Sequence, residues 1–177
     1  APVSLAKAQV TVKSKAYTGK TLKPTSVTVK VGGKKLVSGR DYTVSCKGGK
    51  AVGSYKVTIK GKGAYTGTKT ATFKILPKAT SVSKTKAAKR GFTVAWKKPS
   101  KANLKQTTGY KVQWSTDKNF KKAVKSKLVK KSKTTSLKVS KLKGGKKYYV
   151  RVCAYKKVGS AYYYSAWSKA KAVKTKK

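Results

Sequence analysis

The feature that most constrains this chain is a two-residue alternation of apolar and polar side chains that recurs along its length. A β-strand with one buried face has this period, because successive side chains point to opposite faces of the sheet. Clear runs of the alternation occur at residues 27–31, 55–59, 71–75, 110–114, 137–139 and 148–154. Glycine-rich clusters separate several of them, and Gly32-Gly33 predicts a two-residue hairpin turn. The pattern predicts an all-β chain.

The strands fall into two groups, and Pro77 ends the first of them. Residues 77–90 are polar, basic and small, and strand-like residues resume at 91–96. We therefore expect two antiparallel β-sandwich domains in tandem, residues 1–77 and residues 78–177. Each is large enough for a hydrophobic core of its own.

Alternation also predicts which side chains of the second domain lie inside. Tyr148, Val150, Val152 and Ala154 form an inward face, which leaves Tyr149, Arg151, Cys153 and Tyr155 pointing outward. Residues 162–175 are expected to form a final strand region that carries Trp167 and Val173. Near the middle of the domain, Asp117 predicts a capped helical turn over 117–122, followed by a strand near 123–130.

Several motifs of the second half resemble those of a fibronectin type III domain. They are Trp96 in the second strand, Gly109-Tyr110-Lys111-Val112 in the third, Leu142 before the sixth, the run 148–155 along the sixth, and Ser165-Ala166-Trp167-Ser168 near the last. The resemblance covers about residues 79–177. It implies an antiparallel β-sandwich without an intrinsic catalytic activity.

The first half resembles an immunoglobulin-like module of Gram-positive surface proteins. Its motifs are Tyr17-Thr18-Gly19-Lys20, Asp41-Tyr42-Thr43-Val44-Ser45, Val52-Gly53 and the run 61–68. Cys46 stands where that module usually carries an aromatic residue, and acids are unusually scarce. The tandem is similar to lysine-rich modules found at the C-terminal ends of large secreted proteins of gut Firmicutes, which implies a C-terminal module. This resemblance implies a secreted or cell-surface bacterial protein, with the chain as the mature product after signal removal.

The composition argues against an enzyme. The 177 residues include no histidine and only two acids, Asp41 and Asp117. Without histidine there is no imidazole base, and two carboxylates cannot both cage a hard cation and act as an acid/base pair. Two cysteines cannot complete a structural zinc site. We expect no catalysis, no metal and no cofactor, and Asp41 is interpreted as a structural group at a strand start.

Cys46 and Cys153 are the only cysteines. A disulfide in a secreted chain is one interpretation, but it requires Cα atoms about 4.4–6.8 Å apart. Alternation favours separate thiols, with Cys46 on the core side of its strand and Cys153 outward. A reactive Cys153, with its pKa lowered by nearby cations, is the third alternative.

The strongest functional signal is charge, because 47 basic residues against two acids leave a formal net charge of +45. Dense anionic polymers are natural partners for such a surface. The candidate polyanion-binding residues combine the basic cluster at 121–133 with cationic and aromatic residues of the outward face. They are Lys111, Lys121, Lys122, Lys125, Lys127, Lys130, Lys131, Lys133, Tyr149, Arg151 and Tyr155.

The first hypothesis is a module for adhesion or wall retention that binds teichoic acid, mucin or another anionic cell-wall or host glycan. Alternatives are a non-specific nucleic-acid-binding protein, a structural spacer, and a module that binds a host surface protein. Lysine outnumbers arginine 44 to 3, which disfavours sequence-specific DNA reading. No membrane span is expected, and the charge favours a monomer.

Overall fold

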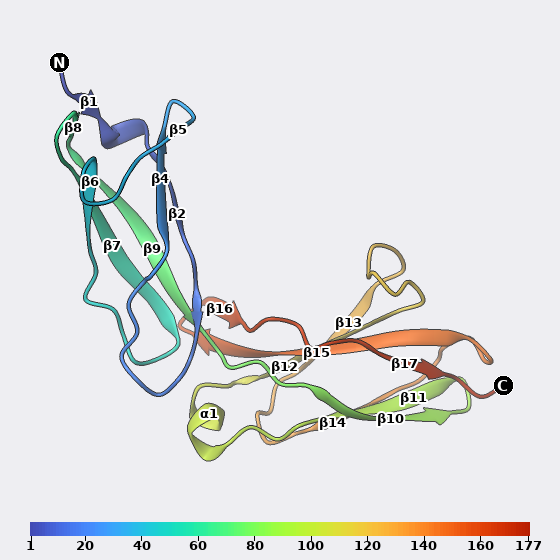
Figure 1. Ribbon diagram of the computed structural model, residues 1–177. Helices are drawn as coiled ribbons and strands as arrows, with labels where there is room; N and C mark the ends of the chain where they lie inside the picture. The colour runs from blue at the N-terminus through green and yellow to red at the C-terminus, as the bar shows by residue number, and fades with distance from the viewer. The chain divides into compact units, whose positions relative to one another are not determined.

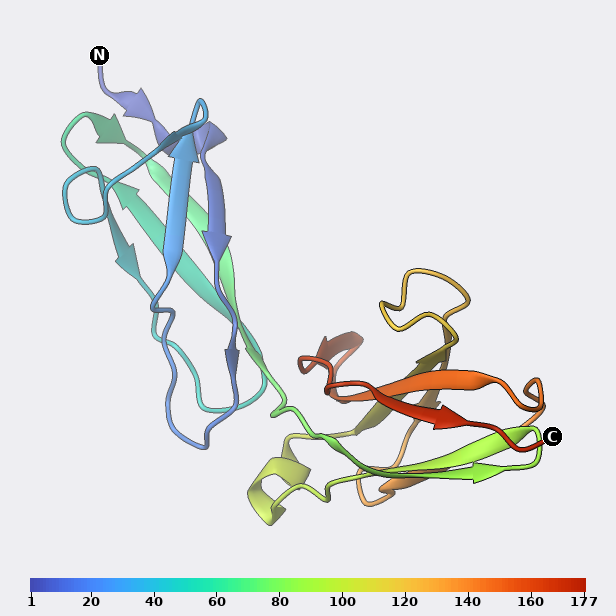
Figure 2. The ribbon, with the colours of Figure 1, turned by 45° about the vertical axis from the view of Figure 1, so that its right-hand side comes forward.

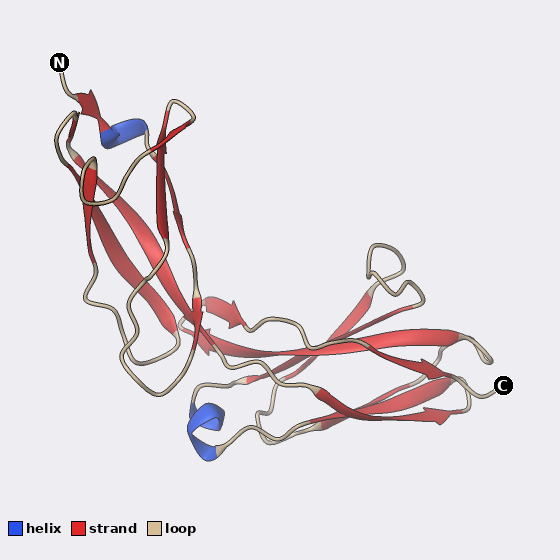
Figure 3. Ribbon diagram, viewed as in Figure 1, coloured by secondary structure: helices blue, strands red, loops and turns tan.

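The computed structural model describes all residues from 1 to 177 and divides them into two compact units, Ala1–Leu76 and Pro77–Lys177. Strands dominate both units, with one short α-helix and one 3-10 turn as the helical elements (Figure 3). The all-β prediction with two sandwich-like units is confirmed. We describe each unit by itself.

The first unit has two main layers (Figure 1). One sheet has the order β2-β4-β5, formed by Gln9–Val12, Val27–Val31 and Lys34–Lys35. The other has the order β3-β9-β7-β6, formed by Lys15–Ala16, Thr68–Leu76, Gly53–Gly61 and Tyr42–Ser45. A short parallel pair, β1 (Val3–Ser4) and β8 (Tyr65–Thr66), lies beside the 3-10 turn Leu5–Lys7.

Alternation predicted the core of this unit well. Val57, Ile59, Phe73 and Ile75 are fully buried between the two sheets. The hairpin between β4 and β5 turns at Gly32 and Gly33, whose φ angles of 54° and 81° suit the tight turn that the sequence predicted. Glycine is favoured there because both positions need a left-handed backbone.

The second unit also has two layers, seen in Figure 2 as the orange and red strands above the green ones. The smaller sheet has the order β10-β11-β14, formed by Val82–Ala88, Gly91–Trp96 and Ser136–Val139. The larger has the order β13-β12-β15-β16, formed by Lys125–Val129, Gly109–Ser115, Lys147–Val158 and Ala161–Tyr164. The α-helix α1 (Lys101–Lys105) connects β11 to β12, and the sequence analysis did not anticipate it.

The core of the second unit is aromatic and β-branched, as its sequence indicated. Trp96, Tyr110, Val150 and Val152 are buried, and the rings of Trp96 and Tyr110 are 5.1 Å apart. The Tyr110 hydroxyl donates to the carbonyl of Ser132 at 2.8 Å, so this buried phenol keeps a hydrogen bond.

The segment 162–175 is not one strand, contrary to the sequence interpretation. It contains β16 and β17 (Lys171–Lys174), which pair with opposite ends of β15. Between β16 and β17, side-chain hydrogen bonds stand in for strand pairing. The hydroxyls of Ser165 and Ser168 accept hydrogen bonds from the backbone N–H groups of Ala154 and Val152, both at 3.0 Å. Trp167 therefore lies in a connecting segment.

Two further boundaries differ from expectation. Residues 82–88 form β10, although their polar composition indicated a connecting segment. They form a strand because their backbone pairs with β11, and not because their side chains alternate between apolar and polar. Residues 117–122 form a hydrogen-bonded turn and no helix, while the expected strand that follows is present as β13.

Candidate binding surface

Most of the positive charge has no carboxylate partner. The only ion pair joins Arg40 to Asp41, with Nε and Oδ1 2.8 Å apart. Asp41 also accepts the backbone N–H of Val37 at 2.8 Å. The hydrogen bond from Arg40 and then that from Val37 lower the pKa of Asp41 to about 2. The predicted structural role of Asp41 is confirmed.

The second acid is also engaged locally. The carboxylate of Asp117 accepts the backbone N–H groups of Asn119 at 2.9 Å, Lys121 at 2.8 Å and Lys122 at 3.2 Å. These hydrogen bonds hold the pKa of Asp117 below its ordinary value, the one from Asn119 most of all. Asp117 thus caps the loop before β13, as predicted, and neutralises no lysine through an ion pair.

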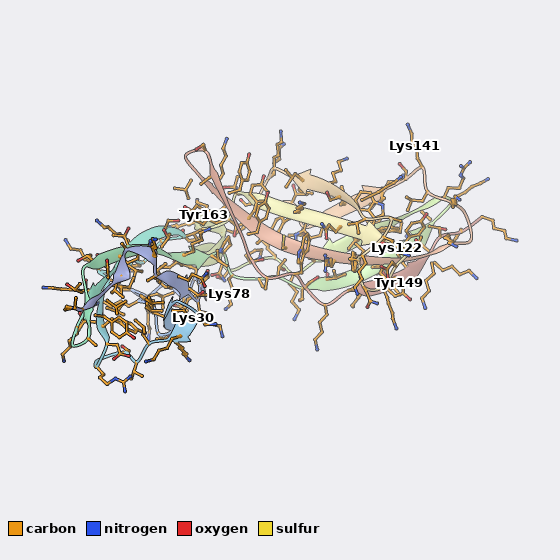
Figure 4. All side chains as sticks on the ribbon, turned by 90° about the horizontal axis from the view of Figure 1, so that it is seen from above. Lys30, Lys78, Lys122, Lys141, Tyr149 and Tyr163 are labelled. Atoms are coloured by element: carbon orange, nitrogen blue, oxygen red, sulfur yellow. The ribbon has the colours of Figure 1, made fainter.

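The lysines of the predicted cluster lie along one edge of the larger sheet of the second unit. Lys121 and Lys122 belong to the loop before β13, Lys125 and Lys127 belong to β13, and Lys130, Lys131 and Lys133 follow it. All seven are exposed, so the structure leaves them available to a ligand. Figure 4 shows lysine side chains extending outward around the outlines of both units, as at Lys141.

The outer face of that sheet, defined here as the face away from the core, carries the remaining candidates. Lys111 is half-buried on β12, opposite Cys153 of β15. Tyr149 is half-buried as well, and the Nζ of Lys147 lies 5.6 Å from its ring centroid. These two residues remain accessible in part.

Arg151 is not a free cation. Its guanidinium carbon lies 4.0 Å from the ring centroid of Phe120 and 4.6 Å from that of Trp167, so the group is stacked against two aromatic rings. Its Nε and Nη2 donate to Oε1 of Gln113 at 3.0 and 2.8 Å. Alternation places Arg151 on the same face as Tyr149 and Tyr155, but the rings that stack on it come from two connecting segments.

Tyr155 and Cys153 point outward as predicted but are not exposed, which corrects the interpretation that both are accessible. Their exposed fractions are 2% and 1%. The ring of Tyr155 lies against Gly109, where an added Cβ would be 3.0 Å from its Cε1, and against the rings of Tyr162 and Tyr164. Tyr155 therefore cannot present its ring to a ligand.

Neither cysteine forms a disulfide. Burial raises the pKa of the Cys153 thiol to about 11, against a smaller lowering effect of Lys111. This overturns the suggestion of a reactive thiol, because desolvation outweighs the nearby cations. Cys46 is half-buried and packs against the core of the first unit, which confirms its predicted side.

Tyr162 and Tyr164 of β16 were not among the predicted binding residues. They are 46% and 37% exposed, and their rings are 6.3 Å apart with 16° between the planes. The signal was present in the sequence, since residues two apart on a strand share a face. What was hidden is that β16 pairs with β15 and brings both rings next to Tyr155.

A cavity of about 480 Å³ opens on the opposite side of the larger sheet, near Trp114. Lys125, Lys141, Lys143 and Lys146 contribute to its lining. The indole Nε1 of Trp114 has no hydrogen-bond partner, but this atom is itself shielded from solvent. The cavity is thus basic, and the indole N–H of Trp114 is not accessible to a ligand that enters it.

Nothing in the fold gathers a metal site, since no three His, Cys, Asp or Glu side chains come together. The structure also contains no helix with the length and apolar character needed to cross a membrane.

Two solved structures align with part of the chain, both at a TM-score under 0.5. The FN1–FN3 domains of chicken CNTN1 match at 20% identity and a TM-score of 0.46, over 72% of this chain and 42% of that one. A β-1,2-glucanase from Parabacteroides distasonis matches at 20% identity and a TM-score of 0.44, over 70% of this chain and 18% of that one. The chain thus spans less than half the length of either.

No curated protein matches the chain by sequence. Residues 77–171 match the fibronectin type III domain, and they make up more than half of the 177 residues. That range lies within the second unit, Pro77–Lys177. The motifs described above lie at the buried Trp96, along β15 and in the segment 165–168. The chain therefore belongs to the fibronectin type III domain family.

Proposed function

We propose that this chain is a non-catalytic module of a secreted or cell-surface bacterial protein. Its lysine-rich surface binds anionic polymers such as teichoic acid, mucin or another acidic glycan, and so serves adhesion or wall retention. Residues 1–76, which the proposal treats as an immunoglobulin-like domain, and the fibronectin type III domain both contribute lysines. The observation that carries the proposal is the single ion pair among 47 basic residues.

The positive charge of an ammonium group without a carboxylate partner is not neutralised. Many such groups together create a positive electrostatic potential that raises the local concentration of a polyanion. Binding then releases the counterions condensed on the polymer, which favours association at low salt. Lysine suits this role because it acts as a point charge and does not require a fixed geometry in its ligand. The segment 121–133 has a high density of lysines in the sequence, and all seven of them are exposed.

The test is a salt titration of binding to lipoteichoic acid, a sulfated glycan and duplex DNA at equal charge concentration. We expect all three to bind at low salt. For duplex DNA, six or more phosphate contacts correspond to a loss of about a thousandfold or more between 0.05 and 0.2 M salt. Absence of binding near physiological salt contradicts the proposal, and a marked preference for DNA makes the chain a nucleic-acid-binding protein instead.

A pair of charge-matched variants locates the binding. In the first, glutamine replaces the seven lysines of the 121–133 cluster. In the control, glutamine replaces seven exposed lysines of the first unit: Lys13, Lys20, Lys30, Lys34, Lys35, Lys47 and Lys50. We expect the cluster variant to bind each polymer more weakly than the control does. Equal losses mean that total charge alone governs binding.

A further inference from the structure

The hairpin of β15 and β16 gathers three tyrosines on the outer face of the larger sheet. We call Tyr155, Tyr162 and Tyr164 the tyrosine platform. Their ring centroids are 5.6, 5.9 and 6.3 Å apart, so the rings form a compact triangle. Tyr155 is buried beneath, whereas Tyr162 and Tyr164 keep 46% and 37% of their surface exposed. Two exposed and nearly parallel rings are thus held on an ordered aromatic base.

Cations flank the exposed rings. The Nζ of Lys157 lies 5.6 Å from the ring centroid of Tyr162, and the Nζ of Lys111 lies 5.7 Å from that of Tyr164. The two carboxylates of the chain, on Asp41 and Asp117, are engaged elsewhere with Arg40 and with backbone N–H groups. The platform therefore combines apolar ring faces with ammonium groups that no acid neutralises.

We propose that the tyrosine platform is a binding site for an acidic sugar residue of an anionic glycan. The C–H face of a pyranose ring packs on the tyrosine rings by dispersion and apolar burial. A carboxylate or sulfate of the same residue meets Lys111 or Lys157, and the tyrosine hydroxyls exchange hydrogen bonds with sugar hydroxyls. The inference rests on the proposed function, because it identifies where the polymer is recognised at short range.

The arrangement favours a sugar over single-stranded nucleic acid. Proteins that bind single strands place aromatic rings successively along a groove that follows the backbone, so that neighbouring bases each find a ring. Here the rings are gathered in one triangle, which offers a single stacking position. The arginine nearest in the sheet, Arg151, is already stacked between Phe120 and Trp167 and is not available to a base.

The test compares four probes: a galacturonate hexamer, its methyl ester, linear polyphosphate and an oligothymidylate of similar length. Binding is measured at about 0.3 M salt, where the Debye length is below ~8 Å. The variant Y162A/Y164A is expected to lose roughly tenfold or more in affinity for the galacturonate hexamer, a loss that corresponds to removing the stacking contact. Its affinity for polyphosphate, measured at low salt, is expected to stay unchanged.

Two controls keep the result interpretable. V44A removes an exposed apolar side chain from β6 of the first unit, outside the platform and the candidate polyanion-binding residues, and is expected to leave hexamer binding unchanged. Because the alanine pair could uncover Tyr155, K111Q/K157Q provides a second variant, matched in charge by K34Q/K35Q on β5. Of these two lysine pairs, only K111Q/K157Q is expected to weaken hexamer binding. The wild-type chain is expected to bind the methyl ester more weakly than the acid.

The outcomes separate the two proposals. If the wild-type chain fails to bind polyphosphate even at low salt, the charge-driven function is wrong. If polyphosphate binds but both platform variants retain hexamer affinity, the platform is not a sugar site. If the platform variants lose affinity for oligothymidylate and not for the hexamer, the site stacks bases, which overturns the assignment to a glycan.

Discussion

At the scale of single residues, Arg151 shows how its surroundings change the role of a charge. Its guanidinium lies between Phe120 and Trp167 and donates two hydrogen bonds to Gln113. A lysine cannot reproduce the planar stacking or the fork of donors. We expect R151K to lower the free energy of unfolding of the second unit by about 1 to 2 kcal/mol, measured by chemical denaturation.

The exposed substitution K174R serves as the matched control, because it also keeps the charge. We expect it to leave stability unchanged and R151K to leave polyphosphate binding unchanged. A loss of polymer binding without a loss of stability in R151K means that Arg151 acts as a ligand-binding cation and not as a clamp.

The two thiols differ in accessibility, which a labelling experiment reads directly. Cys153 is 1% exposed and burial raises its pKa to about 11, whereas Cys46 is half-buried. A thiol-reactive probe at pH 8 is expected to modify Cys46 first and Cys153 only after unfolding, because the thiolate is the reactive form. The raised pKa also means that Cys153 favours the folded state at neutral pH, and that this contribution is lost as the pH rises toward 11.

Mass spectrometry of the labelled chain assigns the modified cysteine, with C46S as the control. In C46S the native chain is expected to stay unlabelled. Rapid labelling of Cys153 in the native state contradicts the burial of its side chain.

At the scale of elements, Asp117 organises the loop before β13. Its carboxylate accepts three backbone N–H groups, and the same loop carries Phe120 to its stack with Arg151. By analogy with helix caps, D117A is expected to destabilise the loop, because three backbone N–H groups lose their acceptor. Faster amide hydrogen exchange at Asn119 and Lys121 is the specific readout, and K118A is the control in the same loop.

The pH dependence of this loop follows from its lowered pKa. A carboxylate whose pKa is lower in the folded state stabilises the fold above its ordinary pKa, and this contribution is lost as the pH falls through the lowered value. D117N is therefore expected to remove the pH dependence of exchange in the loop. Unchanged pH dependence in D117N assigns the effect to another group.

The strand β13 is an edge of the larger sheet, and its lysines have a second role there. Lys125 and Lys127 lie opposite Trp114 and Val112, on the core side of the strand. Charged side chains on the inward side of an edge strand oppose pairing with another chain. We expect K125V/K127V to self-associate in 0.5 M salt, on the order of the concentration that screens long-range repulsion, as measured by light scattering.

The matched control is K130V/K131V, which changes two lysines beyond the end of β13. It removes the same charge and adds the same apolar surface without changing the edge. If both pairs remain monomeric, the edge does not depend on these lysines.

At the scale of the whole molecule, the net charge of +45 opposes compaction. Sodium chloride screens this repulsion, so the melting temperature is expected to rise with salt. A gain of about 1 kcal/mol corresponds to roughly 4–8 °C for a domain of this size. Calorimetry between low and high sodium chloride measures it, and a melting temperature that falls with salt contradicts the expectation.

Most strands and the two hydrophobic cores could be predicted from the amino-acid sequence, whereas α1 and β10 could not. Alternation identified the buried faces of β7, β9, β12 and β15, because a strand with one wet face must repeat every two residues. The glycine pair at 32–33 located a turn, and the 47 basic residues against two acids fixed the net charge. These properties depend on local geometry and composition, which a sequence displays directly.

The tertiary structure alone decided which outward residues a ligand can reach. Alternation assigns a side chain to one face of the sheet but does not show what covers that face. Tyr155 and Cys153 point outward and are nevertheless buried, and rings from β16 pack against Tyr155. The partners of Arg151 come from residues 31 positions before it and 16 after it, which no local pattern relates. Exposure and pairing are set by contacts between distant segments, and those contacts exist only once the sheet has formed.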